Sequence, residues 1–70
     1  MRRDEYFDRR ALAAERQRRG MTMAQLAERA GLTAASISYY ESGSFVPGVS
    51  ALVRLAKALD VPVTRLLKDC

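Results

Sequence analysis

Small hydroxyl and methyl side chains recur at helical spacing in the segment 33–42. Residues three and four apart share one side of a helix. A helix over 34–42 would therefore present one face made of Ala34, Ala35, Ser38 and Tyr39. Hydroxyl groups can donate or accept hydrogen bonds, and methyl groups can pack on apolar surface. The chemistry open to this face is recognition of another molecule and not bond breaking.

Catalysis and metal binding find little support in the remaining residues. The chain has no histidine, and the acids Glu15, Glu28 and Glu41 have no partnered nucleophile. No glycine-rich phosphate loop is present. The single cysteine, Cys70, cannot form an internal disulfide. We therefore predict no enzyme, no metal site, no cofactor and no small-molecule ligand, and we read Cys70 as a frayed free thiol in preference to an intermolecular disulfide.

Length and charge set the class of protein. Seventy residues allow one domain, 1–70, and the net charge of +4 favours a polyanionic partner in a general way. Residues 1–19 carry +3, residues 20–48 carry −1 and residues 49–70 carry +2. No apolar run approaches the roughly 18 residues of a membrane span, and the charged N-terminus lacks a secretory signal. We expect a cytoplasmic protein.

Capping residues divide the chain into helices. Asp4 is a plausible start for the first helix, Thr22 and Gln25 form a capping box for the second, and Gly31 and Gly43 suit the positive φ that ends helices. No stretch alternates long enough to predict a strand. The expected fold is a compact all-α domain of five helices, at about 5–19, 23–30, 34–42, 49–59 and 63–68.

Apolar spacing predicts which face of each helix lies inward. Phe7 is expected to be a core or interface anchor, and Ile37 and Tyr40 to be the inward side of the third helix. The second helix would bury Leu26, Ala27 and Ala30, and the fourth a stripe of Val49, Leu52, Val53, Leu55, Ala56 and Leu59. The fifth would carry Val63, Leu66 and Leu67.

Two helices joined by a short glycine turn form a helix-turn-helix. Close crossing needs a small residue, which Ala27 supplies, and the turn needs a positive φ, which Gly31 supplies. Leu26, Leu32 and Ile37, together with Tyr40, would lock the angle between the helices. These features at these spacings predict a helix-turn-helix over residues 22–42.

The stretches "RRGMTMAQLAERAGLTAASISYYESG" and "LVRLAKALDVPVTRLL" resemble the DNA-binding domain of the lambdoid phage repressor and Cro family, the xenobiotic-response-element type. The resemblance covers residues 10–67. It implies a five-helix domain that binds double-stranded operator DNA as a homodimer, with the third helix in the major groove. It also implies a structural ion pair between Arg16, late in the first helix, and Glu41, at the end of the third.

The expected DNA contacts follow from the resemblance and from the chemistry of the face. Ser38 and Tyr39 would reach a base edge or a phosphate, and alanine methyl groups would pack on thymine methyl groups. The full expected set is Thr22, Met23, Thr33, Ala34, Ala35, Ser38, Tyr39 and Ser42. Arg18, Arg19 and Arg54 are further candidates for phosphate contacts.

The chain departs from the family pattern at several positions. Met23 stands where a phosphate-binding glutamine is usual, and it can offer only its backbone N–H and the helix dipole. Ser44, Phe45 and Val46 occupy a loop that often carries lysine or arginine. Alanines replace the glutamine or arginine that would read adenine or guanine, so direct discrimination would be weaker and DNA shape would contribute more.

Plainer interpretations remain open at this stage. The alanines can be simple helix formers, and Tyr39 can pack on the surface. The arginines at positions 2, 3, 9 and 10 can be a solvated charged end or a DNA arm. Phe45 and Val46 can be loop packing or a partner contact, and with the apolar fifth helix they are the expected pairing surfaces. The alternative function is a protein-interaction module or adaptor with little DNA binding, favoured by the −1 charge of residues 20–48.

Overall fold

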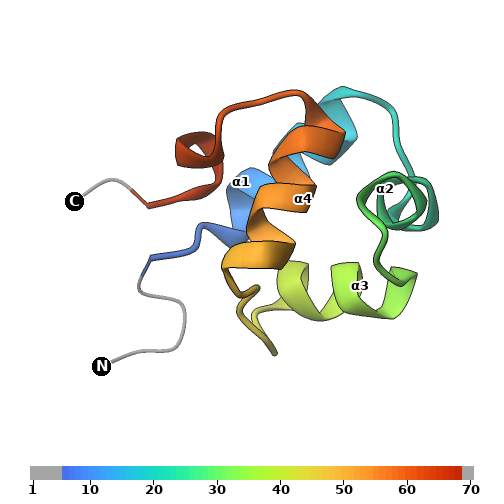
Figure 1. Ribbon diagram of the computed structural model, residues 1–70. Coiled ribbons are helices and arrows are strands. Elements are labelled where there is room, and N and C mark those ends of the chain that lie inside the picture. Colours follow the sequence, from blue (N-terminus) through green and yellow to red (C-terminus); the bar gives the residue numbers. More distant parts are fainter. Residues whose placement is uncertain (1–5, 69–70) are drawn as a thin grey trace.

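The computed structural model describes residues 6–68, which fold into short helices joined by tight turns (Figure 1). Within this range the elements are α1 (Arg9–Arg18), α2 (Met23–Ala30), α3 (Ala34–Ser42), α4 (Val49–Leu59) and the 3-10 helix η1 (Val63–Leu66). The all-α class is confirmed, but the described residues form four α-helices and not five. α2, α3 and α4 have the bounds that the sequence predicted.

The ends of α2 and α3 are fixed by local capping. The Thr22 hydroxyl accepts the N–H of Gln25 at 3.1 Å, and the Gln25 side chain accepts the N–H of Thr22 at 2.9 Å, which completes the capping box. The Thr33 hydroxyl accepts the N–H three residues later at 3.1 Å. Gly31 and Gly43 end these helices with φ of 70° and 86°. Each boundary therefore depends on residues within one helical turn of it.

The predicted start of α1 at Asp4 or Glu5 is wrong. Both residues lie outside the described range, and residues 6–8, which follow them, are not helical. The helix begins after Asp8, whose carboxylate accepts two backbone N–H groups of the first turn at 3.1 Å each. Asp8 is thus the N-cap, because its side chain satisfies donors that have no partner inside the helix.

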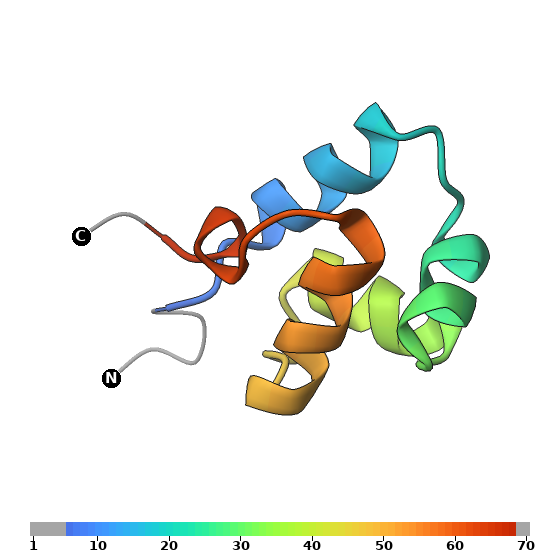
Figure 2. The ribbon, with the colours of Figure 1, turned by 45° about the horizontal axis from the view of Figure 1, so that its top comes forward.

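The segment before α1 is extended and pairs with the end of the chain. Phe7 forms an antiparallel bridge with Leu67, and the N–H of Asp8 donates to the carbonyl of Leu66 at 2.9 Å. Phe7 is only 1% exposed, so its role as a core anchor is confirmed. Figures 1 and 2 both show this segment beside η1. The pairing gives the domain a closed core at the end where its described termini meet.

The same pairing explains why the last helix ends earlier than the sequence predicted. A helix over 63–68 was expected, but η1 ends at Leu66 because Leu67 turns into extended backbone with φ −104° and ψ 150°. Leu66 is fully buried, and Val63 and Leu67 are partly buried against the core. The apolar side of this segment is consequently used inside the domain, and it is not the exposed pairing surface that the sequence suggested.

One core joins all the elements. Its buried members are Phe7, Leu12, Leu26, Ala27, Ala30, Ile37, Leu52, Leu55, Ala56, Leu59 and Leu66. Val49 is an exception to the predicted stripe on α4, since it is 80% exposed. It is the first residue of α4, and the inward side begins only with Leu52.

The turn between α2 and α3 sets the angle of the motif. Ala27 is 3% exposed and has only a methyl group, so α2 can pack closely on α3 and α4. The N–H of Leu32 donates to the Ala27 carbonyl at 2.8 Å, and Gly31 supplies the left-handed residue between them. Ile37 then places the inner side of α3 in the core.

Gly31→Ser should lower the free energy of unfolding by about 1–2 kcal/mol, because a side chain is strained in the left-handed region. Gly48→Ser is the matched control. Gly48 has φ −71° and lies at the N-cap of α4 without a side-chain cap, so serine there should be neutral or stabilising by a few tenths of a kcal/mol. Urea unfolding measures both. Equal losses at the two positions would contradict the proposed constraint.

Candidate nucleic-acid interface

The outer side of α3 is a continuous exposed surface. Ala34, Ala35, Ser38 and Tyr39 are all exposed, whereas Ile37 on the opposite side is fully buried. Tyr40, expected to point inward, is half-buried. The structure therefore brings the four predicted residues together on one face of α3, which we call the reading face.

The predicted hydroxyl groups at the helix ends already have partners. The oxygens of Thr22 and Thr33 accept backbone N–H bonds, and Thr33 also lies 2.9 Å from the hydroxyl of Ser36. Met23 is half-buried, with its side chain against the core. Its backbone N–H is in the first turn of α2, where no intrahelical acceptor is available. The N-terminus of α2 can thus offer a donor although Met23 lacks a polar side chain.

The C-terminal end of α3 is closed by its own loop. The Ser42 hydroxyl donates to the Tyr39 carbonyl at 3.1 Å and lies 2.9 Å from the Ser44 hydroxyl. The N–H groups of Ser44 and Phe45 point to the same carbonyl, at 3.0 and 3.3 Å. Ser42 was predicted as a DNA contact, and its hydroxyl is engaged in capping α3.

An aromatic pair lies at the edge of the reading face. The rings of Tyr39 and Phe45 meet edge to face, with centroids 5.0 Å apart and planes at 86°. The sequence indicated loop packing or a partner contact for Phe45 without naming Tyr39. The two residues are six apart, and the left-handed Gly43 between them folds the loop back onto α3.

The ion pair between α1 and α3 has the geometry expected from the family resemblance. Arg16 donates to both carboxylate oxygens of Glu41, from Nε at 2.7 Å and from Nη2 at 3.0 Å. A third bond runs from Nη1 to the carbonyl of Met21 at 2.8 Å. The two side chains are 11% and 9% exposed. Hydrogen bonding to Glu41 raises the pKa of Arg16 above its ordinary value. Arg16 therefore holds the end of α3 and the end of the α1–α2 turn together.

A second arginine of α1 lies at the same end of α3. Arg9 packs its side chain on Gly43 and directs Nη1 at the Glu41 carbonyl, 3.5 Å away. α3 has no basic residue in its own last turn. Cations near a helix C-terminus stabilise its dipole, and here α1 provides them. Arg9 is thus a structural contact rather than part of a solvated end or a DNA arm.

Sequence reasoning missed the role of Glu15. This carboxylate is buried at 3% exposure and accepts from Arg19 at 2.6 Å, Arg65 at 3.3 Å and Arg18 at 3.5 Å. The hydrogen bond from Arg19 holds the pKa of Glu15 below its ordinary value of 4.5, although burial opposes this. The i+3 and i+4 spacing of Arg18 and Arg19 was visible in the sequence, but the contact with Arg65 depends on the fold.

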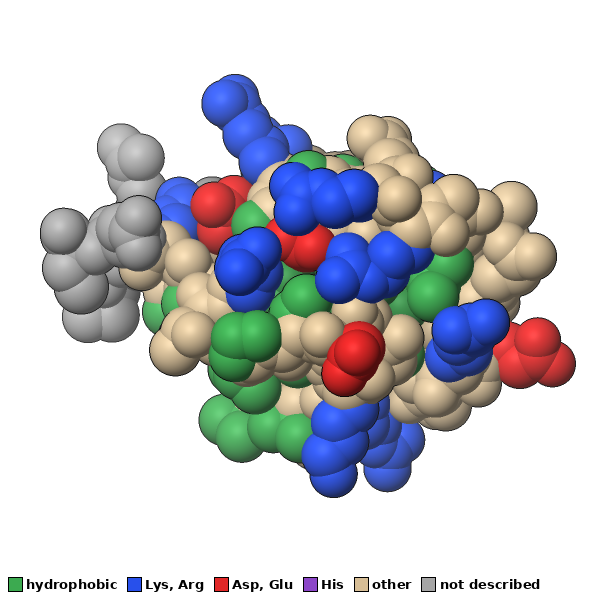
Figure 3. All heavy atoms as spheres, turned by 90° about the horizontal axis from the view of Figure 1, so that it is seen from above, with side chains coloured by type: hydrophobic (Ala, Val, Ile, Leu, Met, Phe, Trp, Pro, Cys, Tyr) green, Lys and Arg blue, Asp and Glu red, His purple; other side chains and the backbone are tan. Residues whose placement is uncertain are grey.

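α3 itself contains no lysine or arginine. Figure 3 views the molecule from the side opposite α3, and lysine and arginine side chains gather on that face. Arg18 and Arg65, with side chains 64% and 55% exposed, belong to the Glu15 cluster. Of the arginines predicted to make phosphate contacts, Arg54 has its guanidinium beside the turn at Gly31.

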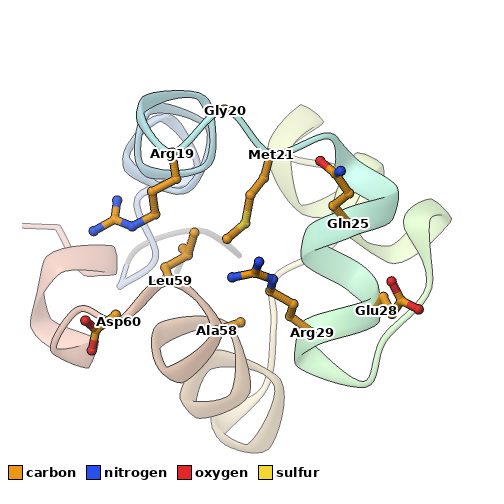
Figure 4. Close-up of a pocket in the computed structure, with 9 residues that line it drawn as sticks. All are labelled: Arg19, Gly20, Met21, Gln25, Glu28, Arg29, Ala58, Leu59 and Asp60. Carbon is orange, nitrogen blue, oxygen red and sulfur yellow. The ribbon is translucent and has the colours of Figure 1, made fainter.

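An open hollow of about 520 Å³ lies between the ends of α1 and α4 and one side of α2 (Figure 4). Met21 and Arg29 point into it, and Glu28 points away. Among residues 6–68 no three His, Cys, Asp or Glu side chains come together as a metal site, and no helix is long and apolar enough to cross a membrane. The lining of the hollow is largely polar, and none of its residues belongs to α3.

Comparison with known proteins defines the family. Residues 12–66 match the family model described as Helix-turn-helix, so the chain belongs to the helix-turn-helix family. It is 36% identical over 55 residues to the transcriptional repressor RstR of the cryptic phage CTXphi in Vibrio cholerae, covering 79% of this chain and 49% of that protein. It is 40% identical over 52 residues to an uncharacterized HTH-type transcriptional regulator of Sinorhizobium fredii, covering 74% and 26%. The chain thus spans half or less of these relatives.

Two solved structures share the fold. The P22 c2 repressor, solved in complex with a synthetic operator, has a TM-score of 0.77 and 30% identity, with 81% of this chain and 86% of that chain covered. The restriction-modification controller protein C.AhdI of Aeromonas hydrophila has a TM-score of 0.80 at 24% identity, with the same coverage. The resemblance to the lambdoid repressor and Cro-like domain is confirmed.

Arg16→Ala should lower the free energy of unfolding by about 3–5 kcal/mol, because Glu41 would keep a buried charge without a partner. Urea unfolding measures the loss. Adding Glu41→Gln to this variant should restore part of the stability, since the uncompensated charge is removed. Arg10→Ala, at an exposed position of α1, is the control and should change little. If the free energy of unfolding of Arg16→Ala equalled that of the wild type, the structural role of the pair would be contradicted.

Glu15 should make stability depend on acid pH. A pKa that is lower in the folded state than in the unfolded chain gives a contribution that is present above pH 4.5 and is lost as pH falls through the folded pKa. Glu15→Gln should therefore lower the melting temperature at pH 7 and flatten its decline as the pH falls below 4.5. Glu28→Gln, at an exposed position of α2, should leave the profile unchanged. Parallel profiles for the wild type and Glu15→Gln would refute this assignment.

Proposed function

We propose that this chain is the DNA-binding part of a transcriptional regulator, and that it lays α3 in the major groove of its operator. The observation that carries the proposal is the reading face: four neighbouring residues of α3 are exposed, while Ile37 behind them is fully buried. α3 is also held in place by α2 and by the Arg16–Glu41 pair. An outward face on a helix held at a fixed angle is what entry into a groove requires.

The roles of the contact residues follow from their chemistry. The methyl groups of Ala34 and Ala35 would pack on thymine methyl groups, and Ser38 and Tyr39 would hydrogen-bond at base edges or phosphates. Thr22 and Thr33 accept backbone N–H bonds through their oxygens, and their own O–H groups can donate to phosphates. Met23 would contribute its backbone N–H. Ser42 would support the face by capping α3.

We further propose that the regulator acts as a homodimer with half-sites about 34 Å apart. The pairing surface we nominate is the Phe45–Val46 loop with Val49. Phe45 is 53% exposed and Val49 is 80% exposed, and both adjoin the start of α4. Val49 replaces the fifth helix in this proposal, because the apolar residues of η1 are taken up by the core.

A protein-interaction module is the second candidate. The observation that favours it is the position of the charge, since lysine and arginine gather on the face away from α3 (Figure 3). The exposed side chains of Arg18 and Arg65 both pair with a single buried carboxylate, that of Glu15. Such a surface would suit an acidic polypeptide, with α3 left unused.

Titration of a labelled mixed-sequence duplex separates the two candidates. A regulator should bind at low salt and lose affinity steeply between about 50 and 200 mM salt, because phosphate contacts release counterions. Selection from a random DNA pool should then recover two half-sites, and halving the recovered site should weaken binding. Absence of duplex binding at low salt, or an empty selection, would overturn the proposal and support the adaptor.

On the selected operator, Tyr39→Ala should weaken binding by about tenfold or more, within the roughly 1–3 kcal/mol that one base contact contributes. Tyr39→Phe keeps the ring and should show the part of the loss that belongs to the hydroxyl. Gln17→Ala changes an exposed residue of α1 and serves as the control. Melting temperatures should stay close to the wild type. Unchanged operator affinity would remove Tyr39 from the contact set.

A further inference from the structure

Tyr39 is the largest side chain of the reading face, and its own helix does little to restrain it. A helical residue neighbours those three and four positions away on the surface. For Tyr39 these are Ala35, Ser36, Ser42 and Gly43, which are all small. The Tyr39 side chain is also 47% exposed. None of these four neighbours is bulky enough to select one direction for the phenol.

The loop after α3 provides the missing restraint. Phe45 meets Tyr39 edge to face, and the centroids of the two rings are 5.0 Å apart. Aromatic rings prefer this perpendicular arrangement, so the contact favours one orientation of the Tyr39 ring. Phe45 is itself 53% exposed, so burial in the core does not account for its position.

Phe45 is held to Tyr39 by backbone contacts as well. Its N–H donates to the Tyr39 carbonyl at 3.3 Å, beside the N–H of Ser44 at 3.0 Å and the Ser42 hydroxyl at 3.1 Å. The left-handed Gly43 permits this return of the chain. The loop that carries Phe45 is therefore anchored to the residue whose ring it contacts, and the ring pair has a fixed base.

We propose that Phe45 is a positioning residue that sets the direction of the Tyr39 phenol and thereby the base preference of the reading face. This inference rests on the proposed function. A side chain that is ordered before binding loses less conformational freedom on contact and can discriminate between neighbouring acceptors. Phe45 acts through Tyr39 and makes no base contact of its own.

The contact can be tested without DNA. The Tyr39 ring protons should show a ring-current shift in the proton NMR spectrum of the wild type. Phe45→Leu keeps an apolar side chain but removes the ring, and it should abolish this shift. Phe45→Tyr keeps the ring and should retain it. A Tyr39 spectrum that is identical in the wild type and Phe45→Leu would overturn the proposal before any binding measurement.

Base preference is then measured by selection from a random duplex pool with each variant. Tyr39→Ala identifies the operator position that Tyr39 reads. Phe45→Leu should reduce preference at that position by about two- to tenfold, the range for an aromatic contact, over and above any uniform loss of affinity that comes from the proposed pairing surface. Phe45→Tyr should restore it. In a Tyr39→Ala background, Phe45→Leu should cause no further loss, because coupled residues are not additive.

Each alternative role of Phe45 gives a different result. A direct base contact would alter a position other than that of Tyr39 and would add to the Tyr39→Ala effect. A role only in pairing would weaken binding at every position, and Val49→Ser, which leaves the ring pair intact, would reproduce it. Either result overturns the proposal. A wild type that selects no operator refutes the proposed function instead, and the NMR test of the ring pair still stands.

Discussion

The ion pair between Arg16 and Glu41 fixes where α3 ends relative to α1. Both carboxylate oxygens are engaged, and the same guanidinium holds the Met21 carbonyl at the entry to α2. One side chain thus ties together the three segments that a helix-turn-helix must hold at a constant angle. Arg9 adds a second cation at the end of α3. The hydrophobic effect is non-directional, so these directional bonds add to the orientation that core packing and the turn at Gly31 provide.

The arginine cluster around Glu15 and the exposed side of α3 belong to different elements of the domain. The reading face carries methyl groups and hydroxyls, whereas the arginines that pair with Glu15 connect α1 to η1 on another side. Those arginines have a structural role, because all of them pair with one buried carboxylate. If α3 enters a major groove as proposed, a face with few charges would make affinity depend more on shape and on close approach of the helix than on bidentate pairs.

Most of the fold could be predicted from the sequence where the determinants are local. Thr22, Thr33, Gly31 and Gly43 act within one turn of the helix ends that they define, so α2 and α3 had the right bounds. The start of α1 was misplaced because Asp4 and Asp8 both suit an N-cap, and local signals did not choose between them. The extended backbone before Asp8 and the end of η1 have a different origin. They depend on the pairing of Phe7 with Leu67, which are sixty positions apart and meet only when the core has formed.

The amino-acid sequence alone determined the family, the helix-turn-helix and the four residues of the reading face, because helical period and capping are properties of neighbouring residues. Tertiary structure alone decided which side chains surround them. The fold brings Arg65, which is fifty residues away in the chain, into hydrogen-bonding distance of Glu15. The loop after α3 folds back and places the Phe45 ring against Tyr39. Contacts between elements depend on their relative placement, which no local spacing encodes.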